Sequence, residues 1–214
     1  MKKGYLFVII SGILSGGIVF GGQVLANIGL SSYEITMLPS FFTLIFLLPF
    51  IIFKKECRLT RDKIGILAIF GLIAGVLGVS QYGSVIIGVP VSIAVLLLYT
   101  QPLWTIIFSK IFLNENITKY KLLSLAIILL GLIFLIDPFK ITKIGNLPGI
   151  IVGLIGGISL SGWVIFGRVA GKKEIHPITT KFGYVLFMLI FLVISYPLVN
   201  LAVKEPSIIS ISFK

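Results

Sequence analysis

Long apolar runs, separated by short polar segments, occupy most of this 214-residue chain. A helix crosses the hydrocarbon core of a bilayer with about 20 apolar residues. The pattern predicts seven membrane-spanning helices, at residues 4–26, 34–53, 64–83, 90–112, 119–137, 147–170 and 179–203. We therefore expect an all-α polytopic membrane protein.

Composition and charge support this interpretation. Hydrophobic residues make up 57% of the chain and charged residues only 12%, whereas soluble domains carry about 25% charged residues. The net charge of +11 comes from basic residues gathered in alternate connections, such as 54–63 and 171–181. Because cytoplasmic loops are enriched in Lys and Arg, we expect a multi-pass protein of the cell membrane with a cytoplasmic amino terminus. Lipid, and not nucleic acid, is the partner that this charge pattern indicates.

An internal repeat relates the two ends of the chain. A shift of 145 residues aligns four glycines of the first run with four of the sixth, Gly4, Gly12, Gly17 and Gly22 with Gly149, Gly157, Gly162 and Gly167. Residues 1–138 would form a first five-helix repeat, 139–146 a loop, and 147–214 the start of a second repeat. An odd number of helices inverts the second copy, and inverted repeats are typical of transporters.

Glycines also recur at four-residue spacing within the runs. The pairs are Gly12/Gly16, Gly17/Gly21, Gly71/Gly75 and Gly149/Gly153/Gly157. Such pairs allow helix backbones to approach closely. The same smooth faces would also allow helices to slide or rock against each other, and the spacing leaves both interpretations open.

Neutral polar and aromatic side chains are the candidate chemistry inside the membrane, since the carboxylates all fall near helix ends or in loops. Gln101 would line a wet cavity or bond a neighbouring helix, because an unpartnered amide in hydrocarbon is costly. Pro102 should bend its helix at mid-depth. We expect a substrate site between the repeats, in which the two tryptophans stack on the solute, formed by Gln81, Tyr82, Tyr99, Gln101, Trp104 and Trp163.

Residues 99–136 resemble the end of a repeat of the EamA family, in the drug/metabolite transporter superfamily. The shared features are Pro102, the Leu113-Asn114-Glu115 segment and Gly131, although Ser124 stands near where a further glycine is usual. The resemblance implies ten helices in two inverted repeats around a central cavity. It also implies alternating-access transport of small organic metabolites, such as amino acids, sugars or drugs, without a cofactor.

A ten-helix fold would extend beyond this chain. Adding the repeat offset to the end of the first repeat places the end of the second at roughly residue 282, whereas the sequence printed here ends at Lys214. We therefore expect that a C-terminal helical segment or a second copy of the chain is needed for transport. The alternative is a non-transporting fragment or a partner-dependent membrane subunit.

Two other classes of membrane protein fit less well. Seven-helix receptors have an external amino terminus, and retinal proteins need a lysine in the last helix, which 182–203 lacks. A membrane enzyme or metal site is not expected, because His176 is the only histidine and pairs with no cysteine in sequence. We expect His176 to be a solvated loop residue, and Cys57, the only cysteine, to react with reagents that reach the cytoplasm.

Overall fold

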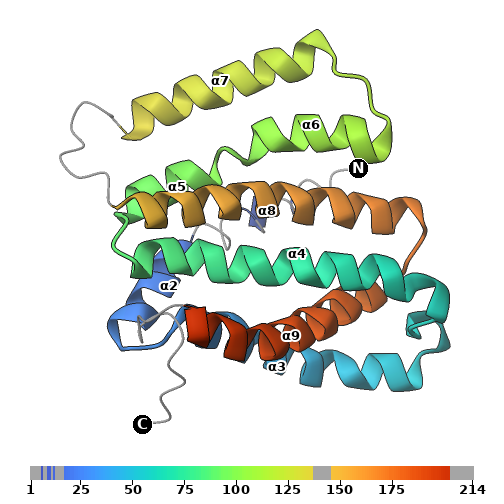
Figure 1. Ribbon diagram of the computed structural model, residues 1–214. Coiled ribbons are helices and arrows are strands. Elements are labelled where there is room, and N and C mark those ends of the chain that lie inside the picture. The colour runs from blue at the N-terminus through green and yellow to red at the C-terminus, as the bar shows by residue number, and fades with distance from the viewer. Residues whose placement is uncertain (1–5, 7–8, 11, 13–16, 137–145, 203–214) are drawn as a thin grey trace.

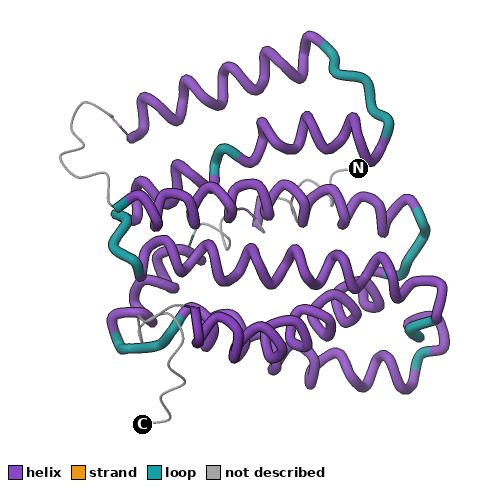
Figure 2. The backbone as a smooth tube through the Cα atoms, viewed as in Figure 1, coloured by secondary structure: helices purple, strands orange, loops and turns teal. Residues whose placement is uncertain are grey.

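The computed structural model describes residues 6, 9–10, 12, 17–136 and 146–202. These residues form helices and connecting loops, with no strand among them (Figures 1 and 2). The elements are α2 (Ile18–Asn27), α3 (Ser32–Phe53), the 3-10 turn η1 (Lys55–Cys57), α4 (Arg61–Ile86), α5 (Val91–Leu98), α6 (Gln101–Leu113), α7 (Lys119–Ile136), α8 (Leu147–Lys172) and α9 (Pro177–Ala202).

Five segments of the described chain are long and apolar enough to cross a bilayer. They are Ser32–Phe53, Arg61–Ile86, Val91–Leu113, Leu147–Lys172 and Pro177–Pro197. The predicted span 119–137 forms α7, and the later part of the span 4–26 forms α2, whereas 4–5, 7–8, 11 and 13–16 lie outside the described residues. The structure thus confirms an all-α polytopic membrane protein, while the repeat boundaries at 138 and 147 stay predictions.

Side-chain caps fix where two of the long helices begin. The Ser31 hydroxyl accepts a hydrogen bond from the Glu34 amide at 3.2 Å, and the Glu34 carboxylate accepts one from the Ser31 amide at 2.7 Å. At the start of α8, the Asn146 side chain accepts from the Gly149 amide and donates to the Ile87 carbonyl, both at 2.8 Å. The second bond joins the start of α8 to the end of α4, so these two helix ends lie side by side.

Helices α4 and α8 are the centre of the bundle. Helices α3 and α9 pack on one side of this pair, and α5 and α6 pack against the other face of α8 (Figure 1). Helix α7 lies outermost, beyond α6, with most of its large apolar side chains exposed (Figure 1). In this order, α8 separates α3, α4 and α9 on one side from α5, α6 and α7 on the other.

The break in the fourth predicted span confirms the effect expected of Pro102. Helix α5 ends at Leu98, and α6 begins at Gln101 with Pro102 in its first turn. Proline has no amide hydrogen, and its ring clashes with the carbonyl four residues earlier, so the helix cannot continue through this point. The Thr100 hydroxyl donates to the Leu97 carbonyl at 2.7 Å and accepts from the Trp104 indole at 3.3 Å. The first bond gives the Leu97 carbonyl, next to the break, a side-chain donor. The second bond joins the side chains of Trp104 and Thr100 across the start of α6.

Glycines bring α8 against this break, as two of the predicted spacings require. A β-carbon on Gly153 would lie 2.6 Å from the Leu97 side chain, and one on Gly157 would lie 2.5 Å from the Leu97 carbonyl oxygen and 2.6 Å from the Thr100 hydroxyl. On α4, one on Gly71 would lie 2.7 Å from the Tyr184 carbonyl of α9. Close helix approach is therefore confirmed at these positions.

The glycine pairs of the first run have a different outcome. A β-carbon added at Gly12 or Gly21 would meet no atom of the described structure within 4 Å. Gly16 is outside the described residues. The structure therefore gives no close helix contact at Gly12 or Gly21, because spacing alone does not determine whether a partner helix faces the stripe.

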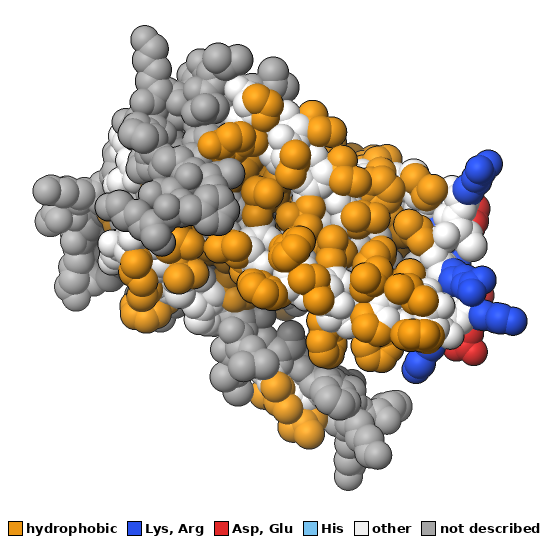
Figure 3. Space-filling view, turned by 90° about the horizontal axis from the view of Figure 1, so that it is seen from below, with side chains coloured by type: hydrophobic (Ala, Val, Ile, Leu, Met, Phe, Trp, Pro, Cys, Tyr) orange, Lys and Arg blue, Asp and Glu red, His pale blue; other side chains and the backbone are white. Residues whose placement is uncertain are grey.

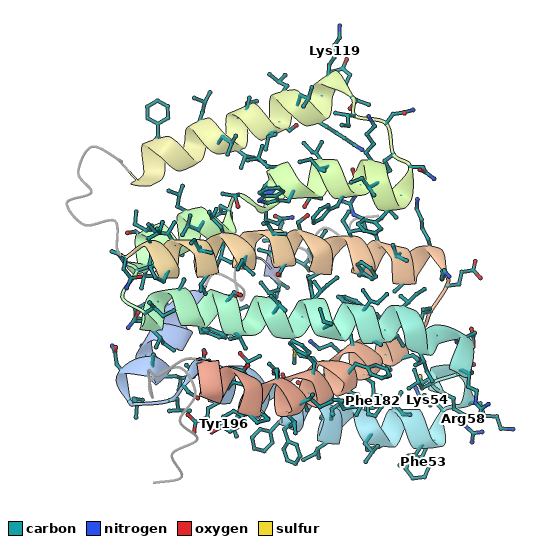
Figure 4. The ribbon with its side chains drawn as sticks, in the orientation of Figure 1. Phe53, Lys54, Arg58, Lys119, Phe182 and Tyr196 are labelled. Carbon is teal, nitrogen blue, oxygen red and sulfur yellow. The ribbon has the colours of Figure 1, made fainter. Side chains whose placement is uncertain are left out.

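Basic side chains gather at one end of the bundle (Figure 3). The connections 54–60, 114–118 and 173–176 meet at this end, where Lys54, Arg58 and Lys119 project (Figure 4). This is the arrangement that the charge pattern predicts for one membrane face. We call it the basic end.

Cys57 and His176, which lie in different connections of the chain, are in contact at the basic end. The Cys57 thiol lies 3.5 Å from Nδ1 of His176, and its residue is only 1% exposed. Nδ1 also accepts a hydrogen bond from the Ile178 amide at 3.3 Å, and the Thr179 hydroxyl donates to the Cys57 carbonyl at 2.8 Å. The expectations of an accessible thiol and of no cysteine-histidine pair were therefore wrong, whereas His176 does lie in a loop, where it is half-buried. The contact joins the α3–α4 connection to the α8–α9 connection.

Burial of Cys57 predicts slow reaction with thiol reagents. Maleimide should label the folded protein in detergent at least about tenfold more slowly than the SDS-denatured protein, because a buried thiol reacts only during local opening. Replacing His176 by Ala should speed the labelling by removing the ring that covers the sulfur, whereas His176→Phe keeps a covering ring. Equal rates for folded and denatured protein would contradict the contact.

The close approach of α8 to the break predicts a specific cost for one methyl group. Gly157→Ala should destabilise the protein by about 1–3 kcal/mol, because the added carbon meets backbone that cannot move independently. The matched change Gly131→Ala in α7 should leave stability unchanged or slightly higher, since no atom lies within 4 Å of that position. Thermal unfolding in detergent measures both variants, and an equal effect at the two sites would refute the packing argument.

Candidate functional site

Two cavities lie between α4, α8 and α9. The first, which we call the Gln81 cavity, has a volume of about 330 Å³ and is also lined by α3. Its α3 and α4 walls lie in the half of the bundle farther from the basic end, whereas its α8 and α9 walls lie nearer that end, because α8 ends and α9 begins there. Its polar lining consists of Thr36, Ser40, Thr43, Gln81, Tyr82, Lys181 and Tyr184.

Helical periodicity directs these side chains into one space. On α4, Ala74, Gly78, Gln81 and Tyr82 follow the spacing i, i+4, i+7 and i+8, so they share a face. The two small residues leave the volume into which the glutamine and tyrosine project. On α9, Lys181 and the residues three, four and seven positions later form the opposing face.

A second cavity of about 580 Å³ lies toward the basic end. We call it the Thr180 cavity, and its wall includes Gly167, Arg168, Gly171 and Thr180. It shares Trp163, Lys181 and Tyr184 with the Gln81 cavity. These three side chains therefore form a partition between two spaces that follow one another along the bundle.

The partition is held by aromatic contacts. The Tyr184 ring stacks on Phe70 with centroids 4.4 Å apart, and it meets Trp163 edge-on at 6.4 Å and 88°. The Lys181 ammonium donates to the Tyr184 hydroxyl at 2.6 Å. Phe70 and Tyr184 are buried, whereas Trp163 is 36% exposed, so the indole is the member of the set with room to contact a solute.

The polar groups of the Gln81 cavity differ in whether they already make hydrogen bonds within the protein. The hydroxyls of Thr36, Ser40 and Thr43 donate to carbonyls of their own helix at 2.7–2.8 Å. By contrast, the structure gives the Gln81 amide and the Tyr82 hydroxyl no hydrogen-bond partner among the described residues. These two groups and the Lys181 ammonium are the ones that could bind a solute.

The structure separates the six site residues expected from the sequence. Gln81, Tyr82 and Trp163 line the Gln81 cavity. Gln101 lies on the other side of α8, where its amide donates to the Thr105 hydroxyl at 2.7 Å and Thr105 in turn donates to Ser161 at 3.0 Å. Trp104 bonds the helix break, and Tyr99 is 50% exposed beside it. The two tryptophans therefore share no cavity, because Trp163 of α8 lines the Gln81 cavity whereas the Trp104 indole of α6 bonds Thr100 at the helix break.

Several lining residues were missed in the sequence. Thr36, Ser40 and Thr43 form a hydroxyl stripe at i, i+4 and i+7 in an otherwise apolar run, which is a detectable pattern. Lys181 and Tyr184 were assigned to a loop and to an apolar helix, although their three-residue spacing places them on one helix face.

The three family-motif residues occupy distinct positions. Pro102 is in the first turn of α6, and Gly131 is in α7 with open space around it. Glu115 follows the left-handed Asn114 at the end of α6, where its carboxylate lies 2.9 Å from the Lys121 ammonium and 3.8 Å from the Arg168 guanidinium. Within the described chain no group of three or more His, Cys, Asp or Glu side chains is arranged to hold a metal ion.

Comparisons with known proteins find transporters. The "Uncharacterized transporter" of Clostridium kluyveri is 25% identical over 210 residues, covering 92% of this chain and 68% of that protein. An "Uncharacterized transporter" of Archaeoglobus fulgidus is 29% identical over 174 residues, covering 81% of this chain and 59% of the relative. An "S-adenosylmethionine uptake transporter" of Rickettsia prowazekii is 29% identical over 151 residues, covering 68% and 48%. No solved structure matches the chain.

The family comparison covers the part of the chain in which the motif residues lie. The sequence profile of the EamA-like transporter family matches residues 2–137, which include α2 to α7. This range contains Pro102, Glu115 and Gly131, together with Gln81 and Tyr82 of the cavity. The chain therefore belongs to the EamA-like transporter family.

Proposed function

We propose that this protein takes part in the transport of small organic solutes across the cell membrane by alternating access. The observation that carries the proposal is the pair of cavities that meet at Trp163, Lys181 and Tyr184. The two cavities follow one another along the bundle, and a movement of this partition would open the path between them. A volume of about 330 Å³ is at the lower end of the range for small-molecule sites.

Rocking of α8 and α9 against α4 is the movement that the packing favours. The proposed first repeat supplies α4, and the proposed second repeat supplies α8 and α9. Gly71, Gly75 and Gly162 leave smooth surfaces at the contacts between these helices. Sliding across such a surface breaks few interlocking side-chain contacts, so two arrangements of the partition would differ little in energy.

The chemistry of the lining suggests the class of solute. Lys181 would bind a carboxylate or another anionic group, Gln81 and Tyr82 would hydrogen-bond polar groups, and Trp163 would stack on a planar or apolar part. Amino acids and related metabolites combine these features. S-adenosylmethionine belongs in the test panel because relatives of this chain carry the name of S-adenosylmethionine uptake transporters.

Substitutions in the Gln81 cavity should weaken transport selectively. In proteoliposomes tested with labelled amino acids, sugars and S-adenosylmethionine, Lys181→Met should reduce uptake of a carboxylate solute at least about tenfold. Gln81→Leu should reduce it about fivefold, as expected for one neutral hydrogen bond.

Lys55→Met is the matched control, because Lys55 is exposed in η1 and lines neither cavity. Uptake unchanged in both cavity variants would overturn the assignment of the site. No uptake of any solute by correctly folded protein would favour the alternative, a membrane subunit that does not transport by itself.

The proposed orientation places the basic end in the cytoplasm. With Cys57 replaced by Ser, a cysteine introduced at the exposed position of Lys55 should react with an impermeant maleimide only after the cells are opened. A cysteine introduced at Ile28, which is 71% exposed at the opposite end, should react in intact cells. The reverse pattern would invert the topology.

A further inference from the structure

A third cavity lies on the other face of α8, and Arg168 is the one lining residue that it shares with the Thr180 cavity of the proposed transport path. It runs between α6 and α7 and reaches Arg168 of α8, with a volume of about 360 Å³. We call it the Gln101 groove. Its α6 wall extends from Gln101 to Ser109, which corresponds to about 12 Å along the helix axis.

Cationic side chains surround the mouth of this groove at the basic end. Lys121 and Arg168 line it, and their side chains are 38% and 51% exposed. The Lys172 ammonium donates to the carbonyl of Leu113, two residues before Glu115, at 3.4 Å. An anion at the mouth would therefore find donors that already point toward water.

Glu115 is the one acidic group among these cations. Its hydrogen bond from Lys121 lowers the pKa of the carboxyl, with smaller contributions from Arg168 and Lys172, so Glu115 stays ionised. The carboxylate holds Lys121 at 2.9 Å but Arg168 only at 3.8 Å. The guanidinium thus retains most of its donors, and the three charges that line the mouth sum to one positive charge.

Below the mouth the groove becomes apolar. Ile106 of α6 and Leu125 and Ile128 of α7 line this part, and Ile128 is 45% exposed. At the inner end, the Gln101 amide donates to the Thr105 hydroxyl, and that hydroxyl donates to Ser161. The sides thus combine a cationic surface at the level of lipid head groups with a hydrocarbon surface below it.

We propose that the Gln101 groove binds one anionic phospholipid, with its phosphate on the sides of the Lys121 and Arg168 head groups that face water, away from Glu115, and an acyl chain along α6 and α7. Basic pockets between helices at the cytoplasmic face suit anionic head groups. Tyr120, 82% exposed beside Lys121, adds the aromatic group typical of a membrane interface. A soluble phosphate would use the mouth alone and leave the apolar part without a function.

The test is a lipid titration of the purified 214-residue chain in neutral detergent, measured by native mass spectrometry. Phosphatidylglycerol should bind about 30-fold more tightly than phosphatidylcholine, because each of the two basic residues contributes about tenfold or slightly less. Inorganic phosphate and glycerol 3-phosphate, added as competitors, should not displace the lipid. Equal binding of the two lipids, or displacement by either soluble anion, would overturn the proposal.

Variants distinguish lipid binding in this groove from unspecific attraction between anionic lipids and the basic end. Lys121→Gln combined with Arg168→Gln should remove the preference, whereas Lys55→Gln combined with Arg58→Gln removes the same charge at the same end and should retain it. Leu125→Trp should weaken phosphatidylglycerol binding by filling the apolar part of the groove. Circular dichroism checks that each variant folds.

The outcomes are decisive in both directions. Loss of preference in the Lys55/Arg58 variant would reveal unspecific attraction, and full binding by the Leu125→Trp variant would exclude the acyl-chain position. Lys121 and Leu125 line neither cavity of the proposed path and Arg168 lines only the Thr180 cavity, and the readout is lipid binding and not uptake, so failure of this proposal leaves the transport proposal intact.

Discussion

The close approach of α8 to the break between α5 and α6 is the contact on which the architecture depends. Backbone polar groups inside a bilayer need partners within the protein, and Pro102 interrupts the helical ladder at mid-span. Glycines at 153 and 157 let the α8 backbone lie directly against the interrupted turn, so that protein and not lipid covers it. Helix α8, fixed in this way, separates the Gln81 cavity on one face from the Gln101 groove on the other.

Features that depend on neighbouring residues in the chain could be predicted from the sequence. Which helices pack together, and which side chains share a cavity, could not. The break followed from Pro102 because proline acts within its own turn. The placement of Gln81, Gln101 and Trp163 within apolar helices also followed from their places in the apolar runs. Which of them share a cavity depends on the face of α8 that each helix meets, and sequence spacing carries no information on that. The contact of Cys57 with His176 joins residues 119 positions apart, so no local pattern could reveal it.

Arg168 connects the two proposed sites. Its side chain lines both the Thr180 cavity and the mouth of the Gln101 groove. A phosphate that drew the guanidinium toward α7 would remove a positive charge from the wall of the Thr180 cavity. In this arrangement, the lipid composition of the membrane and the electrostatic potential on the path of a solute are linked through one side chain.

The polar groups around the helix break have a further property in common. The hydroxyls of Thr100, Thr105 and Ser161 and the amide of Gln101 neither gain nor lose a proton at physiological pH. The exposed ends of α5 and α6 are peptide dipoles, which do not titrate either. Acidification of the cell or of its surroundings would therefore leave the charge of these four side chains unchanged, so the polar contact that they make between α6 and α8 is independent of pH.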